Sequence, residues 1–203
     1  MKANHWYKFS FKSRPSSIFV YDSNFDQVIL IILFLLHWYF SLFCQSFFLH
    51  RYAAHQMFVM NPYWEKFFYF FTWLWQGSSY LSPRAYAILH RMHHAYSDTP
   101  QDPHSPHHTE NLFSMMWKTK NIYNDYFSFK LRPEERFSKD IPDWNRFDRF
   151  ADSMLVRLGW GIFYVAIYIA CISYFELAGT HWWMYFLLPI HFLMGPVHGA
   201  IVN

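Results

Sequence analysis

The sequence predicts an all-α integral membrane protein in which apolar helices alternate with polar segments. Hydrophobic residues make up 53% of the 203 residues and aromatic residues 24%, yet the mean hydropathy is only −0.05. Such an average requires strongly apolar blocks between strongly polar ones. A helix needs roughly 20 apolar residues to cross a bilayer. Three blocks meet that requirement and are read as transmembrane helices, namely residues 28–49, 159–177 and 182–202.

The chain divides into a short arm and one domain. Residues 1–27 are polar and aromatic and are read as an N-terminal arm, followed by a single domain over residues 28–203. Residues 28–49 contain no charged side chain and are long enough to cross a bilayer, so they are read as the first span. This helix delivers His50 and His55 to one face of the membrane.

The next apolar block, residues 64–79, is predicted to lie along the membrane surface as an interfacial helix. It is short for a crossing, and Pro83 follows its end. A crossing would also place His50 and His55 on the opposite face of the membrane from His90. If these histidines share a metal site, the segment between them must return to the face from which it started.

Residues 98–157 hold most of the charged residues and several prolines, which predicts a polar, water-exposed helical cap region. Short helices are expected around residues 111–126 and 143–153. The two apolar runs that follow are predicted to form a transmembrane hairpin. A hairpin returns the chain to the face it left, so Asn203 is expected on the same side as the histidines. The distribution of Lys and Arg leaves the orientation of the N-terminal arm open.

Five of the thirteen histidines lie in two short motifs beside the predicted membrane surface. Residues 90–94 read His-Arg-Met-His-His, and histidines at i, i+3 and i+4 share one face of a helix. The first motif has histidines five residues apart, about 140° from a common face of an α-helix. It is therefore predicted to span a helix end. The candidate metal ligands are His50, His55, His90, His93 and His94.

The ligand type limits the choice of metal and of electron source. Neutral imidazole suits iron, copper, nickel and zinc, whereas calcium and magnesium prefer oxygen. A closed structural zinc site usually includes cysteine, but Cys44 and Cys171 both lie inside apolar runs and form no C-x-x-C pair. Five histidines exceed the needs of one zinc and favour two metals. No flavin, nicotinamide or nucleic-acid-binding motif is found, so electrons are expected from a partner and no nucleic acid is expected.

With these motifs the chain resembles the membrane-bound fatty-acid desaturases, in particular the acyl-CoA (stearoyl, Δ9-type) branch and its bacterial relatives. The resemblance covers roughly residues 28–203. It is carried by residues 50–55 (His-Arg-Tyr-Ala-Ala-His), 90–99 (His-Arg-Met-His-His-Ala-Tyr-Ser-Asp-Thr), 102–104 (Asp-Pro-His) and 199–203 (Gly-Ala-Ile-Val-Asn).

The resemblance implies a di-iron (Fe) centre and dioxygen, which together remove two hydrogens from adjacent methylenes of a saturated fatty acyl chain and form a cis double bond. It also implies surrounding membrane lipid and an electron donor such as a ferredoxin or a cytochrome b5-type protein. For a bacterial relative it implies the inner membrane, with the histidine boxes on the cytoplasmic face. In the family pattern the iron ligands are His50, His55, His90, His93 and His94, with Asn203 reaching iron through a water.

The chain also departs from the family pattern. Family members continue past this asparagine to another histidine and a third histidine box, so we expect an N-terminal fragment that is itself inactive, or a truncated relative. Relatives acting on acyl-CoA often carry an Arg-Asp pair before the middle box, where this chain has Ile88-Leu89. The choice between acyl-CoA and acyl-lipid therefore stays open. Alternative functions are a histidine-box hydroxylase of the same superfamily and a non-catalytic membrane protein that binds zinc or simply packs.

Polar residues outside the two boxes receive structural readings. His37 is read as a packing histidine inside the first span, and His191 and His198 as residues that face the bundle interior. His104 is read as part of a solvated loop or as support for the metal ligands. The segment Asp98–Asp102 is read as a turn that fixes the middle box. Four basic residues are read either as a solvated face or as contacts for a phosphate-bearing head group, namely Arg84, Arg91, Lys118 and Lys120.

Overall fold

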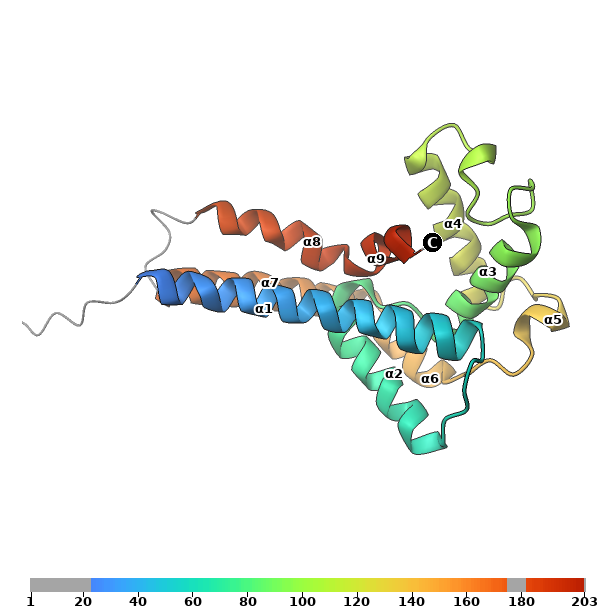
Figure 1. Ribbon diagram of the computed structural model, residues 1–203, viewed down its shortest axis with the longest axis horizontal. Helices are drawn as coiled ribbons and strands as arrows, with labels where there is room; N and C mark the ends of the chain where they lie inside the picture. Colours follow the sequence, from blue (N-terminus) through green and yellow to red (C-terminus); the bar gives the residue numbers. More distant parts are fainter. Residues whose placement is uncertain (1–22, 175–181, 203) are drawn as a thin grey trace, which may run out of the picture.

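The computed structural model describes residues 23–174 and 182–202, and this part of the chain is entirely helical, without a strand. The molecule is elongated, with the apolar helices along its long axis and the polar helices gathered at one end (Figure 1). In chain order the elements are α1 (Ser23–Phe43), η1 (Cys44–Ala54), α2 (Pro62–Gln76), η2 (Gly77–Ser79), α3 (Pro83–Tyr96), η3 (Pro106–His108), α4 (Leu112–Phe127), α5 (Glu135–Ser138), α6 (Asn145–Ala151), α7 (Met154–Tyr174), η5 (Trp182–Leu187), α8 (Leu188–Phe192) and α9 (Met194–Val202).

Two helices in the described part of the chain are long and apolar enough to cross a membrane. The first is Val28–Ala54, in which α1 continues directly into η1; it includes the predicted span 28–49 and extends it. The second is Met154–Ile172 in α7, which begins before the predicted span 159–177. The last residues of that prediction lie outside the described residues.

The third predicted span, residues 182–202, is not one continuous helix, and this expectation was wrong. The segment consists of the 3-10 helix η5 and the two short helices α8 and α9. Pro196 has no N–H to donate to the carbonyl of Phe192 one turn earlier, so a regular helix cannot run through this point. Ser78 takes the place of that donor, because its hydroxyl lies 3.4 Å from the Phe192 carbonyl oxygen.

Buried polar residues join the apolar helices to one another. His37 of α1 meets His191 of α8 with their Nδ1 atoms 2.5 Å apart, and the Tyr168 hydroxyl of α7 lies 2.9 Å from His191 Nε2. Ser41 Oγ lies 3.2 Å from Nδ1 of His198 in α9. All three histidines are buried, which agrees with the expectations that His37 packs inside the first span and that His191 and His198 face the bundle interior. Paired polar groups of this kind hold helices together in an apolar environment.

Helix α2 accounts for most of the predicted interfacial helix 64–79. Its start is set by Asn61, whose side chain accepts the N–H groups of Tyr63 and Trp64, with Pro62 as the first helical residue. One face is buried, and the other exposes large apolar side chains. These exposed residues are Tyr63, Trp64, Phe67, Phe70 and Leu74. The position of α2 in a membrane interface stays a prediction.

The polar end of the molecule is built around α3. Helices α4 and α6 form close to the predicted ranges 111–126 and 143–153. Asp148 of α6 is buried and accepts hydrogen bonds from the hydroxyls of Tyr80 at 2.7 Å and Ser82 at 2.6 Å. This carboxyl ties α6 to the segment from which α3 starts, and so helps to place the helix that carries the second histidine box.

Candidate metal centre

The second histidine box lies on α3, whose start is defined by local sequence. The Ser82 side chain accepts the N–H of Ala85, and Pro83 is the first helical residue. The helix then runs without interruption through the box to Tyr96. The i, i+3, i+4 pattern therefore projects from one continuous helix, as the spacing predicts.

The first box lies on η1, which is a π-helix. The N–H of His55 donates to the carbonyl of His50 at 3.0 Å, a bond between residues five apart, as in a π-helical turn. In this wider helix residues five apart lie roughly one above the other, so the offset of about 140° expected for an α-helix is largely removed. His55 follows the last residue of η1, so the first box spans a helix end as predicted.

Four of the five box histidines converge, and we call them the histidine quartet: His50, His55, His90 and His94. Ligand nitrogens of His50, His55 and His90 lie within 4.8 Å of one another. Nε2 of His90 is 3.0 Å from Nε2 of His55 and 3.0 Å from Nε2 of His94. Two imidazole nitrogens that each lie about 2.1 Å from one metal are about 3 Å apart. The geometry of His50, His55 and His90 is therefore consistent with a metal site, and His94 lies beside it against His90.

Protonation also favours metal binding at the quartet. His90 is buried, and burial, followed by repulsion from the neighbouring histidines when they are charged, lowers the pKa of His90 to about 3. At neutral pH its imidazole is uncharged and keeps a lone pair for a metal. Tyr86 stacks on the His90 ring, with centroids 5.5 Å apart and an interplanar angle of 11°, which restricts the orientation of the ring.

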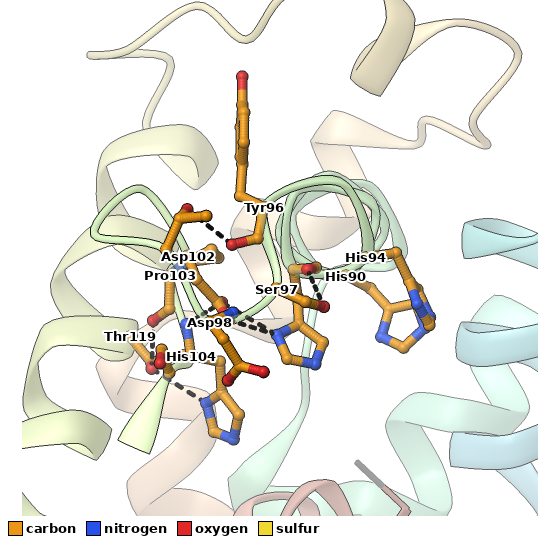
Figure 2. A network of polar contacts seen from close by, with 12 residues as sticks. His90, His94, Tyr96, Ser97, Asp98, Asp102, Pro103, His104 and Thr119 are labelled. Carbon is orange, nitrogen blue, oxygen red and sulfur yellow. Dashed lines mark hydrogen bonds and ion pairs between the residues drawn. The ribbon is translucent and has the colours of Figure 1, made fainter. Parts of the chain in front are cut away.

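His93, the fifth box histidine, stands apart from the quartet. Its ring centroid is 5.8 Å from that of His94 and 6.1 Å from that of His104. Its Nδ1 lies 2.9 and 3.0 Å from the two carboxylate oxygens of Asp102. In Figure 2 His90 and His94 lie on one side of α3, and Asp102 and His104 lie on the other. The two boxes thus present one four-nitrogen cluster and one separate imidazole.

Asp102 is an ionised partner for His93. Burial raises the pKa of this carboxyl, but hydrogen bonds from the His104 N–H, from His93 and from the Asp98 N–H outweigh burial and lower the pKa below its ordinary value. Asp102 is therefore a carboxylate at neutral pH. The predicted turn Asp98–Asp102 after the middle box is present, with the Asp102 N–H donating to the Thr99 carbonyl at 3.1 Å.

Arg91 joins the two boxes. Its Nε donates to the Ala54 carbonyl at 2.7 Å and its Nη2 to the Ala53 carbonyl at 3.3 Å, so it satisfies backbone groups at the end of η1. Its Nη1 donates to the Lys139 carbonyl at 2.7 Å. Arg84 is buried and donates to the Tyr126 carbonyl. The reading of these two arginines as a solvated basic face was wrong, because both guanidiniums bind backbone carbonyls.

The other predicted site residues fall into two groups. Asn203 lies outside the described residues. The histidines of the bundle interior make separate polar pairs, His37 with His191 and His198 with Ser41, and are not part of the quartet. Sequence reasoning missed that Arg91 links the boxes. The position of Arg91 between His90 and His93 could have indicated this link, because a side chain between two ligands on one helical face points close to that face.

A comparison with known protein families matches the part of the chain that contains the candidate metal centre. The family model described as "Fatty acid desaturase" matches residues 27–202, which include both histidine boxes and both long apolar helices. No curated protein and no solved structure matches the chain. The chain belongs to the fatty acid desaturase family.

Proposed function

We propose that residues 28–203 form part of a desaturase domain, preceded by an arm over residues 1–27, that introduces a cis double bond into a saturated fatty acyl chain with dioxygen. The observation that carries this proposal is the convergence of the histidine quartet in a chain of the desaturase family. The subtype that the sequence favours is the acyl-CoA (stearoyl, Δ9-type) branch in its bacterial form. The bound acyl group can be an acyl-CoA or an acyl-lipid.

The reaction explains why such a site is needed. A saturated –CH2–CH2– unit, O2, two electrons and two protons become –CH=CH– and two molecules of water. An unactivated methylene has no acidic proton for a general base, and a bound di-iron centre would supply the oxidising power. Imidazole ligands suit iron, and four of them are already assembled in the quartet. The chain's own contribution is to hold these nitrogens in place within a largely apolar protein.

The ligands divide between two metal positions in this proposal. The quartet holds one iron, and His93 belongs to a second position together with Asn203, which acts through a water.

The arrangement of the helices supports a membrane location for this chemistry. His50 and His55 follow one apolar helix, and the two boxes converge although α2 and η2 lie between them. Convergence agrees with an α2 that stays at one membrane surface, with its exposed aromatic face against lipid. We place the protein in a bacterial inner membrane with the boxes on the cytoplasmic face, where a ferredoxin or a cytochrome b5-type protein delivers electrons.

The decisive experiment is product analysis with the complete protein in iron-replete cells that receive a saturated fatty acid. We expect an unsaturated product by mass spectrometry, about two equivalents of iron per protein, and no product from His90→Ala. His107→Ala is the matched control, because His107 is exposed on the loop after the second box and should leave the product unchanged.

Other outcomes identify the alternatives. A hydroxylated product in place of a double bond would assign the protein to the histidine-box hydroxylases. Stoichiometric zinc without iron and without product would support the non-catalytic reading. Labelled acyl-CoA and acyl-lipid supplied in parallel distinguish the two forms of substrate.

A further inference from the structure

Asp102 is a carboxylate that the fold places behind His93. It has no exposed surface, although it lies in a turn at the polar end of the molecule. One carboxylate oxygen accepts the His104 N–H at 2.8 Å, and the other accepts the Asp98 N–H at 3.3 Å. Both oxygens also face His93 Nδ1, at 2.9 and 3.0 Å. Every polar contact of this carboxylate is therefore with a donor.

The pairing decides where His93 carries its proton. An ionised carboxylate only accepts hydrogen bonds, so Nδ1 of a neutral His93 must hold the hydrogen. The lone pair is then on Nε2, at the opposite edge of the ring. Metal-binding histidines commonly donate their other N–H to a carboxylate or carbonyl. The His93–Asp102 pair has this arrangement, with Nε2 of His93 as the nitrogen that can bind a metal.

The turn that carries Asp102 is fixed independently of His93. Helix α4 binds it at two points, because Lys118 Nζ donates to the Asp102 carbonyl at 3.0 Å and Thr119 Oγ1 donates to the Pro103 carbonyl at 2.8 Å. The His104 ring reaches the same Thr119 hydroxyl, with Nδ1 3.1 Å away (Figure 2). The carboxylate is thus held by its surroundings and imposes its position on the imidazole.

We propose that Asp102 is a positioning residue that holds His93 in the Nδ1–H tautomer and in a fixed ring orientation, so that Nε2 is free to bind a metal at a position separate from the quartet. The tautomer and orientation follow from the contacts of this chain alone. The metal at Nε2 rests on the proposed function. The competing reading is that Asp102 only stabilises its turn by accepting two backbone N–H groups.

Asp102→Asn tests the proposal, because it replaces one acceptor oxygen with an NH2 group. That group can donate to Nδ1, which favours the opposite tautomer with the hydrogen on Nε2. Asp98→Asn is the matched control: Asp98 belongs to the same turn, its side chain is exposed, and its carboxylate pairs with Nε2 of His107 at 3.6 Å. His93→Ala identifies the His93 signal and removes the group through which Asp102 is proposed to act.

The first measurement needs no metal. The side chains of 15N-histidine-labelled, metal-free protein are observed by NMR in detergent, in alkaline buffer where imidazole is neutral. The signal lost in His93→Ala should report an Nδ1–H tautomer in the wild type and in Asp98→Asn, and a shift toward Nε2–H in Asp102→Asn. A wild-type His93 with its hydrogen on Nε2, or an Asp102→Asn variant with unchanged tautomer, overturns the proposal.

The second measurement is a double-mutant cycle on iron content in the complete protein. Asp102→Asn should weaken iron binding at the His93 position by about 10- to 100-fold and have no further effect in the His93→Ala background. Equal losses in both backgrounds would mean that Asp102 acts on the fold and not through His93. If the wild type binds no iron, the proposed function fails, but the NMR result still decides the role of Asp102. If Asp102→Asn does not fold, Asp102→Glu keeps the carboxylate, and an Nε2–H tautomer in that folded variant contradicts the proposal.

Discussion

The guanidinium of Arg91 donates a hydrogen bond through Nε to the carbonyl oxygen of Ala54, at 2.7 Å. The donor lies within the second histidine box, and the acceptor is the residue just before His55 of the first. The two ligand-bearing helices are therefore joined by a direct contact between a side chain and a helix end. A planar donor with several N–H groups can satisfy several carbonyls at once.

Arg91→Met should weaken both folding and metal binding. The variant keeps an apolar stem but leaves the Ala53, Ala54 and Lys139 carbonyls without their donor, at a cost of roughly 1.5–3 kcal/mol. Iron content per chain should fall because His55 is no longer held against α3. Thermal unfolding in detergent and metal analysis check both effects. Arg51→Met, a change at an exposed arginine of the first box, is the control, and an equal loss there would contradict the role assigned to Arg91.

Asp148→Asn should flatten the dependence of stability on pH. Burial raises the pKa of Asp148 from 3.8 to about 6, against hydrogen bonds from Ser82 and Tyr80 that lower it. The folded state thus binds this proton more tightly than the unfolded state. The contribution of this proton to the free energy of unfolding is fully present below pH 3.8 and is lost as pH rises through about 6. It amounts to about 3 kcal/mol at most.

The measurement is thermal unfolding of the wild type and of Asp148→Asn across this pH window. The difference between the two proteins should change with pH, the wild type losing stability relative to the variant as pH rises. Glu135→Gln alters an exposed carboxyl on α5 that is not among the groups acting on Asp148, and this variant should run parallel to the wild type. A wild type that gains stability relative to Asp148→Asn over the same window would show that the sign is wrong.

Two glycine-to-alanine changes should act in opposite directions. A Cβ on Gly195 would lie 2.6 Å from the Ser79 carbonyl oxygen and 3.2 Å from its hydroxyl oxygen, so Gly195→Ala must push α9 away from η2. Overpacking of this kind costs about 1–3 kcal/mol. At Gly159 in α7 a Cβ meets nothing within 4 Å, and Ala favours a helix over Gly by about 1 kcal/mol. Unfolding temperatures that move the same way in both variants would contradict this packing.

Cysteine labelling tests whether α2 stays at one membrane surface. With Cys44 and Cys171 replaced, Val59→Cys before α2 and His107→Cys after α3 introduce thiols at exposed positions. A membrane-impermeant maleimide should label both from the same side of oriented vesicles, because a non-crossing α2 leaves both loops on one face. Lys12→Cys in the N-terminal arm should react from the other side, since α1 is expected to cross. Labelling of residues 59 and 107 from opposite sides would refute the interfacial helix.

Much of the fold follows from short-range sequence. Apolar runs predict the two long helices, because only a helix satisfies its own backbone within an apolar medium. An acceptor side chain followed by proline marks the starts of α2 and α3, at Asn61-Pro62 and Ser82-Pro83. The spacing of the second box places its histidines on one helical face. These features depend only on neighbours in the chain, so the sequence alone determines them.

Other features were decided only by tertiary structure. The π-helical form of η1 aligns His50 with His55, and it is held where Arg91 binds the carbonyls of Ala53 and Ala54. The last apolar run is interrupted at Leu193, between α8 and α9, and Ser78 bonds the Phe192 carbonyl, to which Pro196 has no N–H to donate. Each feature depends on a partner far away in the chain, which local patterns do not identify.

The separation of His93 from the quartet has the same origin. Sequence spacing places His90, His93 and His94 on a common face, and nothing in that spacing distinguishes them. The buried carboxylate of Asp102 faces His93, while the first box approaches His90 and His94. The sequence thus determined which residues form the candidate metal centre. The packing of η1 and of the Asp102 turn on either side of α3 decided how those residues divide, because each imidazole is oriented by the group that contacts it.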